Sequence, residues 1–300
     1  MYIYKAFGLI IASKLEMQEL IIEQSENYDV FIDIGRVPTS IDNFIMQKNH
    51  LTIGRNQMIM DVMDVARFYV ENGSLIIVEP YEDASMEQVK LFLLGSCIGA
   101  ILFQRRIMPI HGSCLKAGED GIILTGKTGA GKSTLATALM REGYELLTDD
   151  VAAVHFDEAI SPVVYSSYPG QKLWQDAISR LDKEEPSMKL IREHEGRTKY
   201  ILSDIRGFHI GSVPLGTIVE IIPMEACELK LDKIQGVEKI NIIMKNTYRR
   251  IMTRGFDIRQ WHFESCLKIA KETAVYRVIR PMGEPLEQEI AQMLLELYMV

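Results

Sequence analysis

The first 85 positions carry apolar residues that alternate or run in short stretches of β-strand length. These stretches cover residues 4–13, 28–35, 50–54, 66–73 and 74–80, and Gly, Asn, Asp or Pro separates them. Asn72-Gly73 stands between the last two stretches and is a strong signal for a tight β-hairpin. We therefore expect residues 1–85 to form a small β-rich N-terminal module.

Residues 84–106 show a different pattern, because apolar residues recur there at helical spacing. The acidic Glu87 lies near the start of this stretch, and Arg105-Arg106 closes it, which matches the charges that the two ends of a helix prefer. We expect a helix that joins the N-terminal module to a second domain over residues 86–300. The arginine pair either complements the helix end or reaches a bound phosphate.

The middle of the chain alternates strand and helix patterns. Strands are predicted over 110–117, 121–124 and 144–148, and a helix begins at Lys132 and ends at a glycine cap, Gly143. The two strands of such a short strand-helix-strand unit run parallel, so their carboxyl ends meet at one edge of the sheet. Ligands of open α/β sheets bind at that edge.

The remainder of the chain completes a mixed pattern. Strands are expected over 151–156, 215–223 and 276–280, a loop over 161–174, a short helix over 175–181, and a charged, mobile surface loop over 182–199. Helical patterns follow over 237–256, 257–275 and 285–299. The predicted fold class is α/β, a phosphate-binding-loop (P-loop) nucleotide domain with the β-rich N-terminal module and C-terminal helices.

A glycine-rich turn opens the helix at Lys132 and matches the phosphate-binding pattern G-x-x-x-x-G-K-[ST]. Glycines let successive backbone N–H groups point at phosphate oxygens, and the helix N-terminus adds partial positive charge. We expect this turn to bind a nucleoside triphosphate, ATP, through Gly126, Lys127, Thr128, Gly129, Ala130, Gly131, Lys132, Ser133 and Thr134.

Several side chains around this turn have the chemistry of phosphoryl transfer. Lys132 supplies a charge for the outer phosphates, and the Ser133 hydroxyl is suited to ligate Mg2+. Asp149-Asp150 follows the next strand, so two carboxylates arrive beside the triphosphate. One carboxylate is needed to hold Mg2+, and a second can accept the proton of an attacking hydroxyl. Adjacent aspartates can alternatively cap a turn.

His111-Gly112, a hairpin, the glycine-rich turn, one helix and a strand ending in Asp-Asp together resemble the catalytic domain of the HPr serine kinase/phosphorylase superfamily. The resemblance is greatest to its shorter relatives encoded with peptide-maturation genes, such as kinases of lasso-peptide biosynthesis. It implies that Asp149 is the catalytic base, that Asp150 helps Ser133 hold the metal, and that His111 lies near the transferred phosphate. It covers about residues 100–155, with a looser likeness over 168–174 and 6–10.

The chain also departs from that family. HPr kinase proper has a Glu-x-Arg-Gly signature after the nucleotide domain, and this chain has Asp204-Ile205-Arg206-Gly207 instead. The reverse, phosphorylase activity is therefore not implied. In the shorter relatives an upstream basic cluster serves in its place, and here that cluster is Arg197 and Lys199. We expect these two side chains either to contact the transferring phosphate or to belong to a solvated run of charges.

A second group of basic and aromatic residues lies in the predicted C-terminal helices. It either receives an acidic or carboxylate-ended substrate or forms a helical surface stripe. Its members are Tyr248, Arg249, Arg250, Arg254, Arg259, Trp261 and His262.

The amino-acid composition limits the kinds of partner that we expect this protein to bind. The net charge is −8, which argues against nucleic acid or an anionic membrane as the main partner. No apolar run reaches transmembrane length, and the first residues lack the basic region and cleavage site of a signal peptide. Four widely spaced cysteines are typical of buried thiols in a reducing cytosol and do not suggest a zinc site: Cys97, Cys114, Cys227 and Cys266.

These patterns predict a cytoplasmic, ATP- and Mg2+-dependent kinase that phosphorylates a serine on a peptide or protein. By resemblance alone, its acceptor is a lasso-peptide precursor. Two alternatives remain open, a small-molecule kinase for a free amino acid or sugar, and a non-catalytic nucleotide-binding regulator. A homo-oligomer is compatible with the sequence, which does not identify the acceptor or the phosphate donor.

Overall fold

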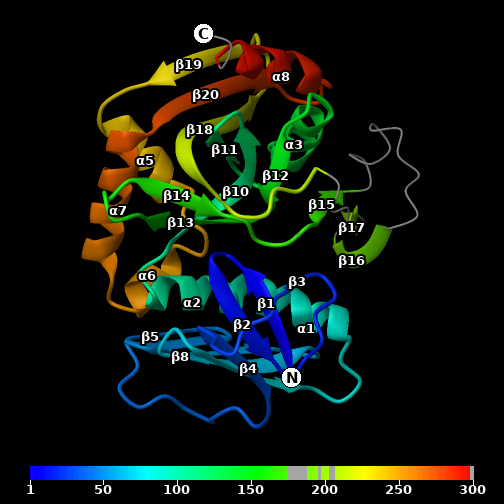
Figure 1. The fold of residues 1–300 in the computed structure, drawn as a ribbon, viewed down its shortest axis with the longest axis vertical. Coiled ribbons are helices and arrows are strands. Elements are labelled where there is room, and N and C mark those ends of the chain that lie inside the picture. Colours follow the sequence, from blue (N-terminus) through cyan, green and yellow to red (C-terminus); the bar gives the residue numbers. More distant parts are fainter. Residues whose placement is uncertain (175–187, 195–196, 203–206, 298–300) are drawn as a thin grey trace.

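A computed structural model describes residues 1–174, 188–194, 197–202 and 207–297 of the chain. It is a mixed α/β structure with two large sheets and one three-stranded sheet (Figure 1). The mixed α/β class, the β-rich N-terminal part and the helical C-terminal part are thereby confirmed. The N-terminus lies beside the first sheet, and the C-terminal helix lies at the far end of the second sheet (Figure 1).

The N-terminal sheet has nine strands in the order β3-β1-β2-β4-β9-β8-β7-β6-β5. Its strands are β1 (Tyr2–Ala6), β2 (Leu9–Ser13), β3 (Ile21–Ile22), β4 (Val30–Ile34), β5 (Met46–Lys48), β6 (Leu51–Gly54), β7 (Gln57–Val62), β8 (Ala66–Glu71) and β9 (Leu75–Pro80). The predicted hairpin between β8 and β9 is confirmed, and Asn72 and Gly73 have φ values of 53° and 66°. The single strand predicted over 4–13 is wrong, because the chain reverses at Phe7-Gly8 to form a hairpin.

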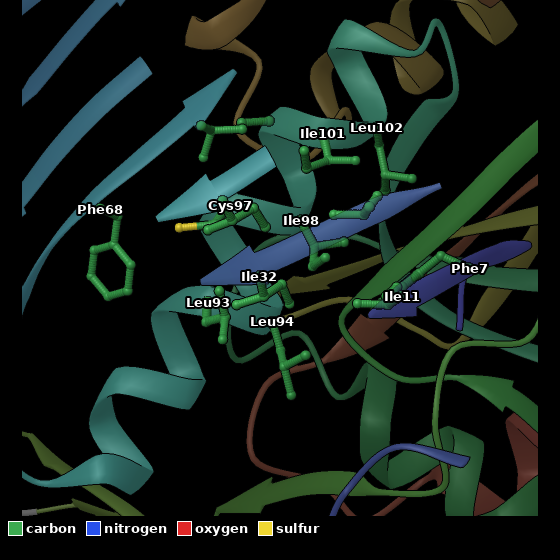
Figure 2. Packing of buried hydrophobic residues seen from close by; sticks show 14 of the residues in the cluster. Phe7, Ile11, Ile32, Phe68, Leu93, Leu94, Cys97, Ile98, Ile101 and Leu102 are labelled. Atoms are coloured by element: carbon green, nitrogen blue, oxygen red, sulfur yellow. The ribbon is translucent and has the colours of Figure 1, made fainter. Parts of the chain in front are cut away.

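One long helical segment covers this sheet. It consists of α1 (Met86–Phe92), a π-helical turn η1 (Leu93–Cys97) and α2 (Ile98–Gln104). Figure 2 shows Leu93 and Ile98 of this segment beside Ile32 of the sheet, and Ile11 and Ile101 belong to the same buried cluster. Within the described residues, Met86–Gln104 is the one helix whose length and apolar character would suffice to cross a membrane, and 67% of that stretch is buried inside the protein. The segment is therefore packed as a core helix.

The helical segment also faces the second half of the molecule. Its hydrophobic cluster includes the N-terminal strands together with Val151, Met252 and Phe256. Figure 1 accordingly shows α2 between the first sheet and the strands and helices above it. The helix thus belongs to the core of the N-terminal sheet as much as to the chain that follows. The domain boundary at residue 86 stays a prediction.

The second sheet follows the order β11-β10-β13-β14-β18-β20-β19, with β12 also pairing with β10 and β11 also pairing with β18. Its strands are β10 (Met108–Ala117), β11 (Asp120–Thr125), β12 (Glu145–Thr148), β13 (Val151–Phe156), β14 (Pro162–Tyr165), β18 (Ser212–Met224), β19 (Lys230–Ile234) and β20 (Ala274–Pro281). β11 and β12 flank β10 and both run antiparallel to it, so the two are parallel to each other, as expected. The helix between them is α3 (Lys132–Arg141).

A third, small sheet corrects two loop predictions. β15 (Gln171–Trp174), β17 (Arg197–Leu202) and β16 (Met188–His194) pair in that order, and β14 lies in the second sheet. The stretch 161–174 is therefore largely strand, and so is the described part of 182–199. β-Pairing between distant segments stabilises these strands, which have no strong local pattern. The helix predicted over 175–181 lies outside the described residues.

The C-terminal part consists of α5 (Val237–Lys245), α6 (Ile251–Gly255), α7 (Arg259–Glu272) and α8 (Glu287–Glu296), with β20 between the last two. The helix predicted over 237–256 is wrong in its middle, because residues 246–250 leave the helical path between α5 and α6. In this break, the backbone N–H of His111 donates to Asn246 O and that of Tyr248 donates to Pro109 O. Pairing with β10 thus replaces the helical hydrogen bonds.

Candidate active site

The middle of β10 is the meeting point of the candidate site. Gly112 on β10 is opposite Thr125, the last residue of β11, and Cys114 is opposite Thr148, the last residue of β12. The glycine-rich turn leaves β11 at this end, and Asp149 leaves β12 there. Three stretches of sequence, around residues 111, 126 and 149, are thereby brought together at one edge of the sheet, as the parallel arrangement predicts.

Gly112 permits the close approach of β10 and β11. A Cβ at this position would lie 2.3 Å from the carbonyl oxygen of Leu124, which is too close for any side chain. The Thr125 hydroxyl donates to His111 O over 2.7 Å and holds the same pair of strands together. The glycine after His111 is therefore required by strand packing directly beside the site.

The glycine-rich turn adopts a backbone that its glycines make accessible. Gly126, Gly129 and Gly131 have φ values of 142°, 82° and 100°, and a Cβ at Gly126 would lie 2.5 Å from Ile221 O. The Lys132 ammonium donates to Gly126 O over 3.0 Å and to Lys127 O over 3.1 Å. The predicted cation thus lies within the curl of the turn at the N-terminus of α3.

Asp149 is held by two serine hydroxyls. Ser113 Oγ donates to Asp149 Oδ1 over 2.5 Å, and Ser133 Oγ donates to the same oxygen over 3.1 Å. The aspartate is only 6% exposed. The sequence predicted that Ser133 works with Asp150, whereas these contacts join Ser133 to Asp149.

Asp150 lies against His111 instead. Its φ of 88° is left-handed, and the Thr148 hydroxyl, which donates to Val151 O over 2.7 Å, braces the turn around it. His111 Nδ1 lies 3.0 Å from Asp150 O and 3.4 Å from its Oδ1. Because both partners accept hydrogen bonds, the Nδ1 atom carries the proton.

The environment keeps His111 neutral. Burial lowers the pKa of His111 below its usual range, and the Lys132 ammonium adds to the lowering, while Asp150 opposes it. With its proton on Nδ1, the neutral ring has an acceptor nitrogen at Nε2. His111 can therefore accept a hydrogen bond from a hydroxyl, and it can donate to a phosphate through Nε2 only when protonated.

A pocket of about 520 Å³ opens beside His111 and the turn. One side consists of His111 and the first residues of the turn, and the other consists of the break between α5 and α6. Its lining residues are His111, Gly126, Lys127, Thr128, Lys245, Asn246, Thr247, Tyr248 and Arg249. Pockets of this size are typical of ligand sites.

Tyr248 connects this pocket to the N-terminal helical segment. Its ring centroid is 6.0 Å from that of His111. A Cβ at Gly99 would lie 3.1 Å from the Tyr248 ring, and one at Gly95 would lie 3.1 Å from its hydroxyl. The two glycines form a notch that accommodates Tyr248, and η1, with its π-helical turn, is part of that notch.

Sequence reasoning missed three residues that support the turn. Gln171 Nε2 donates to Ser133 O over 2.9 Å, and Thr137 Oγ1 donates to Gln171 Oε1 over 2.9 Å, which ties β15 to the start of α3. Arg280 is 6% exposed, forms an ion pair with Glu287 and reaches within 3.0 Å of a Cβ built on Gly131. These contacts cross long sequence separations, so local spacing could not reveal them.

The predicted basic-aromatic cluster is divided by the fold. Tyr248 and Arg249 line the pocket, whereas His262 is 3% exposed and burial lowers its pKa to about 4. The Trp261 ring packs edge-on against Phe103, inside the molecule. A buried neutral histidine cannot receive an acidic group, so the prediction is wrong for His262.

The remaining predicted basic residues lie apart from this pocket or outside the described side chains. Arg105 forms an ion pair with Asp29 over 2.8 Å, and the Arg106 guanidinium lies 5.4 Å from the Trp261 ring centroid, so the arginine pair has a structural role. The backbones of Arg197 and Lys199 belong to β17, and their side chains lie outside the described residues. Their contact with a phosphate stays a prediction.

The cysteines are free thiols, and Cys97, Cys114 and Cys266 are buried. Burial raises the pKa of Cys266 to about 12, which keeps it a neutral thiol. Among the described residues no cluster of three His, Cys, Asp or Glu side chains has the arrangement of a metal site.

Comparison with known proteins gives a partial match. No family model matches the chain. A stretch of 45 residues is 44% identical to the HPr kinase/phosphorylase of Pelodictyon phaeoclathratiforme (strain DSM 5477 / BU-1), and it covers 15% of this chain and 14% of that protein. The solved Hpr(Ser) kinase/phosphatase from Coxiella burnetii aligns with 64% of this chain and 90% of its own, with 13% identity and a TM-score of 0.32.

The chain thus has a distant, partial sequence similarity to HPr kinase/phosphorylase. The match spans about one seventh of that relative's length. Similarity to the peptide-maturation subgroup stays a prediction.

Proposed function

We propose that this protein is an ATP-dependent kinase that transfers the γ-phosphate to a serine hydroxyl of a peptide or protein. The observation that carries this proposal is the convergence of three segments at the middle of β10. The glycine-rich turn with Lys132, the Ser133–Asp149 pair and the His111–Asp150 pair meet there. The partial match to HPr kinase/phosphorylase supports the same reaction.

The residues present fit ATP and Mg2+. The turn offers backbone N–H groups and the Lys132 ammonium to the phosphates. Ser133 and Asp149 offer a hydroxyl and a carboxylate oxygen that already lie 3.1 Å apart, and Mg2+ prefers such oxygen ligands together with phosphate and water. When bound, the metal would neutralise charge that develops on the transferring phosphate.

The two carboxylates share two tasks, metal binding and proton acceptance. In the division that the resemblance implies, Asp149 is the base and Asp150 binds the metal. The contacts favour the opposite division, because Asp149 accepts a hydrogen bond from Ser133, whereas Asp150 contacts His111, which lines the pocket. In either case the serine oxygen forms a bond to the γ-phosphorus, the bond to the β–γ bridging oxygen breaks, and the serine proton passes to the base.

The protonation state of His111 determines its role in the reaction. As a neutral ring with the proton on Nδ1, it positions Asp150 through Nδ1 and leaves the serine O–H free to donate to the carboxylate base. This differs from the charge-stabilising part that the resemblance implies. Lys132 supplies positive charge at the phosphates in this arrangement.

We further propose that the acceptor is a ribosomally made precursor peptide, such as a lasso-peptide precursor, and that the protein acts in the cytoplasm, with or without forming homo-oligomers. A small-molecule kinase would use the same nucleotide site with a free amino acid or sugar. A nucleotide-binding regulator would bind ATP and transfer nothing.

Intact-mass spectrometry after incubation with ATP and Mg2+ tests this function. Lasso-type precursors, HPr and free serine are compared side by side, and we expect a phosphate on a peptide or protein serine. ATP binding or hydrolysis without a phosphorylated acceptor would contradict the proposal and favour the regulator, and phosphate on free serine alone would favour the small-molecule kinase.

Asp149→Asn and Asp150→Asn decide between the two divisions of labour. If Asp149 binds the metal, its substitution raises the Mg2+ concentration needed for transfer, whereas Asp150→Asn lowers kcat at every Mg2+ concentration. The reverse pattern would establish Asp149 as the base. Asp64→Asn is a matched control, because Asp64 is exposed and has a left-handed φ of 62° like Asp150.

A further inference from the structure

The pocket beside His111 extends well beyond the turn. Its volume of about 520 Å³ includes a wall made by residues 245–249, which lie outside the phosphate-binding motif. The wall joins the site at His111, whose backbone N–H donates to Asn246 O over 2.8 Å. A ligand that occupies this part of the pocket therefore lies on the side of His111 and Asp150.

Cationic side chains make up a third of the described lining residues of this pocket. Lys127, Lys245 and Arg249 contribute to it, and none of the described residues that line it is an aspartate or glutamate. The chain as a whole has a net charge of −8, so this basic concave surface contrasts with the rest of the molecule. A concave, positively charged surface attracts anionic ligands.

Arg249 is an exposed cation of the wall. It has a left-handed backbone with φ of 47°, an uncommon conformation for a residue with a side chain. Its guanidinium lies 5.7 Å from the Tyr248 ring centroid, and among the described residues no carboxylate lies within 4 Å of it. Arg249 is thus held at the pocket with its charge available to a ligand.

Lys245 has a different role, because the buried carboxylate of Glu220 neutralises its positive charge. Glu220 is 1% exposed and lies 2.5 Å from Lys245 Nζ and 2.9 Å from Arg277 Nε. Glu220 also stands in register with Thr125, the residue before the turn. The ion pairs of Glu220 with Lys245 and Arg277 therefore fix the wall relative to the turn. Arg249 is left as the residue of the wall that recognises a ligand.

Tyr248 is unsuited to stack a nucleotide base in this pocket. Its ring lies in the notch of Gly95 and Gly99, and His111 and Arg249 lie at its other sides. The aromatic residue thus supports Arg249 rather than offering an open face. The wall formed by residues 245–249 therefore suits a charged group of a ligand better than a nucleotide base.

We propose that this pocket is the acceptor subsite of the kinase and that Arg249 binds the carboxylate of an aspartate or glutamate that flanks the target serine. The inference rests on the proposed function and specifies its substrate class. An acidic flanking residue on Arg249 would place the serine hydroxyl beside His111 and Asp150. Arg249 is then a specificity-determining residue.

Two matched acceptor peptides test this proposal, one with Glu beside the serine and one with Gln in its place. With the wild-type protein we expect the Glu peptide to have a KM about tenfold lower, with similar kcat, and this preference should weaken as salt is raised. Arg249→Asn should reduce the preference to about twofold or less, and Asn is chosen because it tolerates the left-handed backbone. Arg254→Gln, an exposed arginine of α6 outside the pocket, is the control.

Equilibrium binding separates this inference from the proposed function. Labelled Glu and Gln peptides are titrated into protein that contains Mg2+ and a non-hydrolysable ATP analogue. Tighter binding of the Glu peptide that depends on Arg249 supports the subsite even if no phosphate is transferred. Equal binding and equal KM for the two peptides would overturn the subsite while leaving a measured kinase activity intact. Failure of transfer together with Arg249-dependent binding would overturn the kinase alone.

Discussion

The Ser113 hydroxyl lies 2.5 Å from Asp149 Oδ1, and both groups are buried. This pair joins the middle of β10 to the residue that follows β12, the strand that pairs with it. Asp149 also accepts the Ser133 hydrogen bond, so Ser113 fixes the carboxylate at the mouth of the turn.

Ser113→Ala should therefore lower kcat by about tenfold, because a hydrogen bond to a charged group contributes about 1.5–3 kcal/mol. The KM for ATP should change little, since the turn itself is intact. Steady-state kinetics at saturating Mg2+ measures the change. Ser167→Ala is the matched control, because Ser167 is buried and its hydroxyl has no hydrogen-bond partner among the residues that the structure describes. Equal kcat for the wild type and Ser113→Ala would show that Asp149 is positioned without the Ser113 hydrogen bond.

Gly112→Ala should destabilise the fold by about 3 kcal/mol or more. The new Cβ would meet Leu124 O at 2.3 Å, and a backbone carbonyl in a paired strand cannot move aside easily. Urea unfolding measures the loss. Gly35→Ala, whose Cβ would meet only Ile77 at an ordinary 3.8 Å, should leave the midpoint nearly unchanged. A wild-type midpoint for Gly112→Ala would mean that β10 and β11 can separate locally at low cost.

Gly99→Ala should raise the KM of the acceptor several-fold and leave ATP binding unchanged, because the added methyl group displaces the Tyr248 ring at the pocket wall. Acceptor kinetics and ATP titration distinguish the two effects. In the double variant with Tyr248→Ala, the same methyl group should have no further effect, which a double-mutant cycle tests. Additive effects of the two substitutions would show that Gly99 does not act through Tyr248.

The stability of the protein should fall as the pH decreases from about 6.5 towards about 4. Burial, with Arg250 nearby, lowers the pKa of His262 to about 4, whereas an unfolded histidine titrates near 6.5. The unfolded chain therefore binds the proton more readily, and stability that is present above about 6.5 is lost below it, by up to about 3 kcal/mol at this residue.

Urea unfolding at pH 7.5, 6 and 5 measures this dependence. His262→Gln should reduce the loss of stability between these values, whereas His50→Gln, a substitution at an exposed site, should not. Burial also lowers the pKa values of His111 and His155, so part of the dependence should remain in His262→Gln. An unchanged profile for His262→Gln would show that the ring is protonated equally in both states.

The sequence predicted the features that depend on short spacing. The glycine-rich turn, the helix after it and the Asp149-Asp150 pair lie within one strand-helix-strand unit, whose hydrogen bonds and hydrophobic pattern are local. The hairpin at Asn72-Gly73 is local for the same reason, since two residues set its backbone. These elements lie where the pattern placed them.

Tertiary structure decided what surrounds these elements. The break at 246–250, Ser113 beside Asp149, Gln171 beneath Ser133 and Tyr248 in the notch of Gly99 all depend on contacts between segments far apart in the chain. The helical pattern predicted over 237–256 runs through residues 246–250, but pairing with β10 satisfies their backbone groups in another way. Residue spacing identifies the phosphate-binding turn, whereas the packing of distant strands and helices forms the pocket where the acceptor is proposed to bind.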